Sequence, residues 1–533
     1  MTRADRLTAT AILVAAAFVL HGNLGGAGPT RRDERAYADV ARTMLETGDW
    51  ITPRLSGEPF FNKPPLLYWL VAGSELAGGI SPSSARRPVA FLALAGVLLV
   101  WAWAREIAGP RAGAIAALAC IGNALYFTSG RLAMMDAPLA VLVLAATRWL
   151  DRGAPGRGLA AAGLAVLLKG PIGLALPLGA VAAERILAGR ARELARLFSG
   201  PGVVAFLALT APWFVAMERL HGEAFLRKFF LGETLFALVG EEGRRTFPVW
   251  PYLLILPASF VVFLPALFPA ARSALGRRDP PVRLLGLLAL ETVLLFLLSF
   301  RKADRYFVPA VPPLAILIGV LLARGEGRGT RVALRAGTAL LGLLSLAVPA
   351  AVAWGTPEAG WIPAAVSAAP LLLGFALAAR AWRAGRLASI PLSLGASVLA
   401  LEATLVLYLF GALARDPVRR FEEVLAGRGM AGVPLAAETA ALAERLAFDL
   451  RRSVERVPDL PAAEAWLAGP PPRAALLRAE TWNRISRGVR GRAEELGADW
   501  IPPRVSWRWL RERGFSGAFR DREERLVLVA VTR

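Results

Sequence analysis

Two neighbouring carboxyl side chains, Asp33 and Glu34, lie in the segment TRRDERAYADVARTMLETG near the start of the chain. A positioned carboxylate can take a proton as a general base or orient an attacking hydroxyl group. Acidic residues at a helix start also cap the helix and suit the positive end of its dipole, which is the more common role. Asp136 in the segment MMDAPL presents the same two alternatives, because Asp followed closely by Pro is typical of a helix start. These three residues are the candidate catalytic carboxylates.

Phosphate binding is the chemistry that the basic residues suggest. The chain has 62 Lys and Arg residues, of which only four are lysines. Lys63 precedes a Pro-Pro pair, Lys169 precedes Gly-Pro between two apolar runs, and Lys302 lies beside Arg305 and Tyr306. Ammonium and guanidinium groups bind phosphate through charge-assisted hydrogen bonds. The alternatives are side chains that reach lipid headgroups and, for the cluster after Lys302, an ordinary polar turn.

A weaker signal points to a metal site at His221 and Glu223, in a segment that also holds Glu233. Imidazole and carboxylate groups are ligands of divalent cations. A divalent metal is therefore a candidate cofactor, although a single His more often has a structural role. The sequence indicates no other cofactor.

Long apolar runs separate these residues and predict membrane-spanning helices. The chain has 533 residues, 56% of them hydrophobic, and a mean hydropathy of +0.49. Repeated apolar runs of about 18 residues or more are typical of a polytopic, all-α membrane protein. We expect about thirteen spans, near residues 7–22, 88–107, 112–129, 133–150, 158–169, 170–187, 201–217, 249–270, 283–300, 306–323, 332–354, 362–381 and 388–411.

The short connections between these spans set the expected orientation. Arginine clusters in the short connections all fall on one side, which the positive-inside rule makes the cytoplasmic side. The N-terminus is then cytoplasmic, and the C-terminus lies outside. The net charge of +21 favours such loops and contacts with membrane lipids over nucleic-acid binding, for which we find no motif. Cys120 is the only cysteine, so no intrachain disulfide is expected.

Two domains are predicted, a membrane domain over 1–411 and a small α/β domain over 412–533 outside the membrane. The second is more polar and is interrupted by Gly and Pro residues. We expect it to contain helices near 416–428, 438–452 and 484–496 and a closing strand over 525–532.

The first outer loop, residues 23–87, contains its own helix signals. Apolar residues at helical spacing between Thr30 and Gly48 predict an amphipathic helix along the membrane surface. The pair Pro64-Pro65 suits the first turn of a second such helix.

The motifs, in this order, closely resemble those of bacterial GT-C glycosyltransferases. The best match is the aminoarabinose–lipid A transferase branch, which is similar to the protein O-mannosyltransferases. The resemblance covers roughly residues 1–411. It rests on Asp33-Glu34 with Tyr37, Gly48 to Pro53, Lys63-Pro64-Pro65, Tyr68-Trp69, Met134 to Pro138, Lys169-Gly170-Pro171, and Arg305-Tyr306 with Pro309 and Pro312-Pro313.

The resemblance implies an enzyme that takes a sugar from a polyprenyl-phosphate donor, such as undecaprenyl phosphate, on the outer face of the bacterial inner membrane. The acceptor would be a glycolipid of the lipid A type or a protein. Asp33 is then the leading catalytic carboxylate, acting as a base or orienting the acceptor, and Asp136 faces the same cavity. Lys63, Arg305 and Tyr306 would hold the carrier phosphate, with Lys302 and Lys169 as weaker candidates for the same site.

The chain departs from the family pattern at two places. Asn62 stands where the aminoarabinose transferases have an acidic residue, and the segment 232–237 lacks their His or Asn and Arg. A different class, a lipid or glycan transporter or flippase, is the alternative reading. It predicts ionisable residues near the middle of the membrane and two similar halves. The notable charges instead lie at the outer ends of the spans, which favours the transferase.

Overall fold

The computed structural model of the chain describes residues 2–26, 32–55, 57–198, 200–235, 250–276, 279–300, 302–325, 327–355, 361–409, 417–430, 432–438, 454–501 and 524–531. It consists of two units. The first comprises Met1–Gly25, Arg31–Ala353 and Glu358–Phe410, and the second Gly26–Thr30, Trp354–Pro357 and Gly411–Arg533. All the candidate site residues belong to the first unit.

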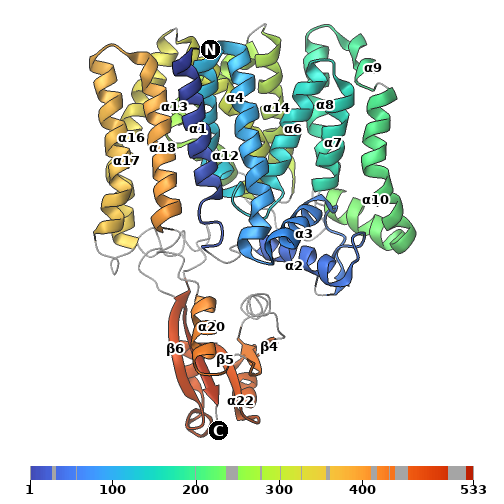
Figure 1. Cartoon of the computed structure of the whole chain (residues 1–533), viewed down its shortest axis with the longest axis vertical. Helices are drawn as coiled ribbons and strands as arrows, with labels where there is room; N and C mark the ends of the chain where they lie inside the picture. The colour runs from blue at the N-terminus through green and yellow to red at the C-terminus, as the bar shows by residue number, and fades with distance from the viewer. Residues whose placement is uncertain are drawn as a thin grey trace. The chain divides into compact units, whose positions relative to one another are not determined.

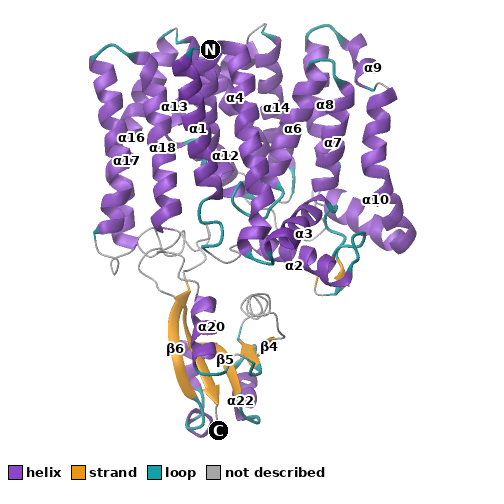
Figure 2. Cartoon of the chain, viewed as in Figure 1, coloured by secondary structure: helices purple, strands orange, loops and turns teal. Residues whose placement is uncertain are grey.

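The first unit is a set of helices that run side by side (Figures 1 and 2). Its longer helices are α1 (Arg3–His21), α4 (Pro82–Ile121), α6 (Asp136–Asp151), α7 (Pro155–Lys169), α8 (Ile172–Leu187), α10 (Gly200–Leu226), α14 (Pro280–Leu298), α15 (Val311–Arg324), α16 (Arg328–Gly355), α17 (Ile362–Arg383) and α18 (Ile390–Thr404). Shorter elements connect them: α5 (Ala124–Ser129), η1 (Ala191–Glu193), α9 (Leu194–Leu197), η2 (Arg227–Leu235), α12 (Trp250–Ser259), η3 (Val261–Phe263), α13 (Leu264–Gly276), η4 (Asp304–Ala310), η6 (Leu387–Ser389) and η7 (Leu405–Leu409).

Within the described residues, seven helical segments are long and apolar enough to cross a membrane. An eighth follows if the helices on either side of Phe260, which meet at 98°, form one bent span. A polytopic helical membrane protein is therefore confirmed, but length alone supports fewer spans than the thirteen predicted. The helices α7 and α8 have 15 and 16 residues, a rise of at most about 24 Å, which is less than a typical hydrocarbon core. The spans predicted over 88–107 and 112–129 fall largely within α4, whose backbone is non-helical at Ala108 and Gly109.

Both helices predicted in the first outer loop are present. They are α2 (Arg32–Thr47) and α3 (Leu66–Gly78), which lie together across one end of the long helices (Figure 1). The buried face of α2 includes Tyr37, Val40 and Met44, at the helical spacing that the sequence shows. At its end Gly48 has φ +72°, a conformation that suits glycine. Between the two helices lies a hairpin of β1 (Arg54–Leu55) and β2 (Glu58–Pro59).

Close packing of α4 against α15 forms the centre of the first unit. Both helices bury apolar residues along most of the facing segments, including Ile115, Leu317 and Ile318. Gly319 permits this approach, because a Cβ atom there would lie 2.6 Å from the carbonyl oxygen of Ala112. The two backbones thus meet closely. η4 leads directly into α15 and packs against α6 and α14.

The second unit has a mixed five-stranded sheet in the order β4-β3-β5-β7-β6 (Figure 2). Strands β4, β3 and β5 are parallel, and β7 pairs antiparallel with both β5 and β6. The elements are α20 (Pro417–Gly427), β3 (Leu435–Ala437), β4 (Val454–Arg456), α22 (Leu460–Ala468), β5 (Arg473–Arg478), α23 (Ala479–Arg484), α24 (Arg487–Arg490), β6 (Glu494–Ile501) and β7 (Glu524–Val531).

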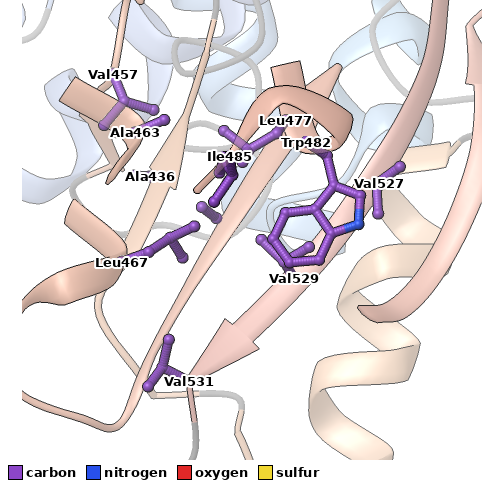
Figure 3. Close-up of a cluster of buried hydrophobic side chains, with 11 residues drawn as sticks. Ala436, Val457, Ala463, Leu467, Leu477, Trp482, Ile485, Val527, Val529 and Val531 are labelled. Carbon is purple, nitrogen blue, oxygen red and sulfur yellow. The ribbon is translucent and has the colours of Figure 1, made fainter. Parts of the chain in front are cut away.

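Alternation along the central strands gives this sheet two apolar faces. Leu476 and Leu528 join the cluster under α20, while Leu477 and Val529 join the cluster with Trp482 on the other face (Figure 3). Because successive side chains of a strand point to opposite faces, a strand covered on both sides needs apolar residues at nearly every position, as β7 has.

Of the four elements predicted for this unit, two are confirmed, one is wrong and one lies almost entirely outside the described residues. The closing strand predicted over 525–532 is confirmed as β7, and the helix predicted near 416–428 as α20. The helix predicted over 484–496 is wrong: only the four-residue α24 forms there, and β6 begins at Glu494 because it pairs with β7. The helix predicted over 438–452 lies outside the described residues apart from Glu438, which is not helical.

Candidate active site

A cavity of about 370 Å³ lies in the first unit, where segments distant in sequence meet. Its size suits a small organic ligand, because such sites typically have volumes of a few hundred Å³. The polar lining comes from α2, the first outer loop, the start of α6, the junction of α7 and α8, η2, the end of α14 and η4. The residues concerned are Asp33, Tyr37, Asn62, Lys63, Asp136, Lys169, Glu233, Ser299, Arg305 and Tyr306.

Each of the three cations that line the cavity is paired with a carboxylate. Lys63 Nζ lies 2.8 Å from Glu233 Oε2, and Lys169 Nζ lies 2.5 Å from Asp136 Oδ1. Arg305 donates to Asp33 through Nη2, and its Nε lies 3.5 Å from Asp136 Oδ2. With all six groups ionised, the formal charges in the lining cancel. The pocket therefore holds three fixed cations without an excess of positive charge.

Local backbone structure explains how these side chains reach the cavity. Asp33 lies in the first turn of α2, and Asp136 begins α6, so both carboxylates lie at helix N-termini. Lys169 ends α7, where a cation suits the helix dipole, and Gly170 with φ +83° then turns the chain into α8. The short 3-10 helix η4 carries Arg305.

Two aromatic side chains complete the site. The Tyr306 ring packs against Phe296, with 5.0 Å between the ring centroids, and Lys169 Nζ lies 4.8 Å from its centroid. Such contacts between a cation and a ring hold the ammonium group in place. Tyr37 is buried on α2. Burial, reinforced by the charges of Asp33 and Asp136, raises the pKa of Tyr37 well above its usual value, so it stays a neutral hydroxyl.

Glu34 does not line the cavity, although the sequence made it a catalytic candidate. Its side chain is 2% exposed and accepts hydrogen bonds from Arg86 Nε at 2.6 Å and Nη2 at 3.1 Å. It also accepts one from the backbone N–H of Ala133 at 3.2 Å. Glu34 thus joins α2 to α4 and to the segment just before Asp136. The structure gives it a positioning role because the helix turns its side chain toward the core and leaves Asp33 facing the cavity.

Lys302, predicted as a phosphate ligand, is also absent from the lining. Its Nζ donates hydrogen bonds to the backbone carbonyls of Phe296, Leu297 and Ser299 at the C-terminal end of α14. Burial lowers the pKa of Lys302. The residue satisfies carbonyl groups that a helix end leaves without partners.

The weakly predicted metal site at His221 and Glu223 does not assemble. His221 Nε2 makes a 2.9 Å hydrogen bond with Thr52 Oγ1, and Glu223 is an exposed residue 3.5 Å from Arg227. Among the residues that the structure describes, no group of three or more His, Cys, Asp or Glu side chains is placed to hold a metal.

The structure brings six of the predicted site residues into the cavity lining, but the sequence did not place Glu233 among them. Its partner Lys63 is 170 positions away, so no local spacing could reveal the pair. Tyr37 was visible as the residue one helical turn after Asp33, since residues four apart share a helix face.

Comparisons with known proteins show similarity in both sequence and fold. Residues 30–218 match a family model described as dolichyl-phosphate-mannose-protein mannosyltransferase. The chain is 30% identical over 332 residues to the undecaprenyl phosphate-alpha-4-amino-4-deoxy-L-arabinose arabinosyl transferase of Edwardsiella ictaluri, over 59% of this chain and 58% of that protein. It is 29% identical over 361 residues to the protein of the same name from Pseudomonas aeruginosa, over 64% of this chain and 65% of that protein. The alignments thus span less than two thirds of these relatives' length.

Two solved structures share the fold. The crystal structure of ArnT from Cupriavidus metallidurans bound to undecaprenyl phosphate superposes with a TM-score of 0.75 at 22% identity, over 98% of both chains. Its apo form gives a TM-score of 0.73 at 22% identity, over 99% of this chain and 97% of that one. The resemblance that the motif order predicted is confirmed: the chain is similar in sequence to aminoarabinose transferases and to the protein mannosyltransferase family model, and it has an ArnT-like fold.

Proposed function

We propose that this GT-C relative is an integral-membrane glycosyltransferase that moves a sugar from a polyprenyl-phosphate donor, most simply an undecaprenyl-phosphate sugar, to a lipid or protein acceptor. The observation that carries the proposal is the cavity itself. It brings together three cations and two helix-start carboxylates, from motifs whose order resembles that of the transferase family.

The cations are suited to the leaving group of such a reaction. The carrier phosphate would lie among Lys63, Lys169 and Arg305, with Tyr306 beside them. As the bond between the anomeric carbon and the phosphate oxygen breaks, its electron pair stays on that oxygen. Fixed cations stabilise the charge that develops there without reorganising during the reaction.

Asp33 is the proposed acceptor-side carboxylate. As the acceptor hydroxyl attacks the anomeric carbon, its proton passes to the Asp33 carboxylate. In the structure Asp33 is paired with Arg305. A phosphate that binds Arg305 would weaken this pair and leave the carboxylate available to the acceptor. Asp136 remains between Lys169 and Arg305 and holds both cations toward the phosphate.

The arrangement in the membrane is part of the proposal. The arginine-rich connections place the N-terminus in the cytoplasm and residues 412–533 outside. Thirteen crossings result if α4 counts as two, α12 with α13 as one, and the short helices α7 and α8 cross as well. The cavity then lies on the outer face of a bacterial inner membrane, with residues 1–411 as the catalytic domain. A polyprenyl tail can stay in the bilayer there while its phosphate enters the pocket.

A glycolipid of the lipid A type is the acceptor we propose first, because the motifs resemble the aminoarabinose–lipid A transferase branch. The names of the curated relatives support the donor side, since they specify undecaprenyl-phosphate aminoarabinose transfer. The proposal is tested by reconstituting the purified chain in liposomes with an undecaprenyl-phosphate sugar and candidate acceptors. Transfer is expected with the wild type and is lost in Asp33→Asn. Mass spectrometry of membrane glycolipids and glycoproteins, with and without the protein, identifies the acceptor. Movement of the lipid across the bilayer without any transfer would instead support a flippase.

A further inference from the structure

We infer that Glu233 selects between two forms of the carrier. Its carboxylate favours the sugar-bearing phosphodiester over the spent phosphomonoester, and so promotes release of the product. The inference rests on the proposed function, since the spent carrier is the product of that reaction.

The position of Glu233 is the first observation. It lies on η2, far in sequence from the other acidic residues of the pocket, and its side chain is 9% exposed. Its Oε2 lies 2.8 Å from Lys63 Nζ, which also donates to the backbone carbonyl of Asn62 at 2.8 Å. All three residues line the cavity. A phosphate oxygen that approaches Lys63 therefore meets the Glu233 carboxylate on the same ammonium group.

The chemistry of the proposed reaction is the second part of the argument. The donor is a phosphodiester with one negative charge. Cleavage of the glycosyl bond leaves the electron pair on the phosphate, so the spent carrier is a monoester that carries nearly two negative charges above its second pKa of about 6. Like charges in one site repel, so the Glu233 carboxylate beside Lys63 destabilises the bound monoester, with nearly two negative charges, more than the bound diester, with one. Without that opposition, three cations would hold the product more tightly than the donor.

The other two carboxylates are less suited to this role. Asp33 is the residue proposed to receive the acceptor proton, so its charge changes during the reaction. Asp136 holds both Lys169 and Arg305, and its removal would release two phosphate ligands at once. Glu233 contacts Lys63 from a separate segment, and its charge can be removed while those pairs remain.

The test compares two lipids on the purified full chain in detergent at pH 8. They are undecaprenyl phosphate, the monoester, and undecaprenyl methyl phosphate, a diester. Glu233→Gln keeps the size of the side chain and removes its charge. We expect its Kd for the monoester to fall about tenfold, which corresponds to roughly 1.4 kcal/mol, and its Kd for the diester to fall less than about threefold. Glu233→Asp keeps the charge and should restore the wild-type preference. Glu218→Gln, the same change at an exposed position on α10, is the matched control.

Turnover supplies an independent readout. If release of the spent carrier is slowed, Glu233→Gln should lower the steady-state rate but keep the single-turnover rate, and the first turnover should appear as a burst. Equal changes in affinity for the two lipids, or weaker binding of both, would overturn the inference, because either result means that Glu233 only orients Lys63. Wild-type protein that binds both lipids with the expected selectivity but transfers no sugar would overturn the proposed function and leave the selectivity intact. Wild-type protein that binds neither lipid would overturn both.

Discussion

Replacement of Glu34 by Gln separates a positioning role from a catalytic one. The change keeps the shape of the side chain but removes the carboxylate charge that pairs with the Arg86 guanidinium, in a site where the two side chains are 5% and 2% exposed. Breaking a buried ion pair by removing one partner costs about 3–5 kcal/mol, far more than a surface pair contributes. Because the unfolding entropy is about 2.1 cal/mol/K per residue, a chain of 533 residues loses about 0.9 °C per kcal/mol, so a loss near 3 kcal/mol lowers the midpoint of thermal unfolding by about 3 °C.

The assay is thermal unfolding of the purified protein in detergent, together with its transfer rate at a temperature where each variant remains folded. Glu34→Gln should be destabilised, and the double variant Glu34→Gln with Arg86→Met should recover part of the loss, because no buried charge is then left without a partner. Asp33→Asn, at the neighbouring position but facing the cavity, should unfold near the wild-type temperature. The reasoning is refuted if Glu34→Gln keeps wild-type stability and loses transfer, since Glu34 would then act in the chemistry.

Three further outcomes are expected. Asp33→Asn should lower the transfer rate by about 10²–10⁴-fold, which is the contribution typical of a general base, while carrier binding, measured separately, is retained. Near-normal turnover would mean that another carboxylate is the base. Lys63→Ala should weaken undecaprenyl-phosphate binding by about tenfold or more. Lys63→Arg should restore only part of this affinity, because a planar guanidinium differs from a compact ammonium in shape and hydration. If a binding titration shows that Lys63→Arg binds like the wild type, the site does not require the geometry of an ammonium group. A reporter enzyme that works only outside the cytoplasm should be active when it is fused after Arg533. If instead a reporter that works only in the cytoplasm is active at this position, the proposed orientation is reversed.

The sequence by itself determined the membrane character of the chain and most of the pocket. Apolar runs and helical periodicity are local properties, so the presence of many long helices, of α2 and α3, and of the strand β7 could be read directly. Asp33, Lys63 and Asp136 stood out because charged residues beside apolar segments are costly unless they have a partner or a function. The order of the motifs then indicated a resemblance to the aminoarabinose transferases and protein mannosyltransferases, and the comparisons confirmed this similarity.

Tertiary structure alone decided between neighbours of similar chemistry. Asp33 and Glu34 are adjacent and both acidic, but successive residues on a helix point about 100° apart, so one faces the cavity and the other is buried against Arg86. Lys302 and Arg305 are three positions apart, yet Lys302 caps the end of α14 while Arg305 enters the cavity. Which residue reaches the site depends on the rotation of the element and on the backbone groups nearby that need hydrogen bonds.

Pairing across long sequence separations was likewise invisible. Glu233 meets Lys63 only because α10 and the first outer loop fold onto each other, and nothing in either segment encodes the other's position. In the second unit, β6 replaces the helix expected over 484–496 because β7 supplies ladder hydrogen bonds along its edge. The intrinsic preference of a segment for helix or strand is weak compared with such pairing. Contacts between distant segments therefore decided both that β6 is a strand and that Glu233 reaches the pocket.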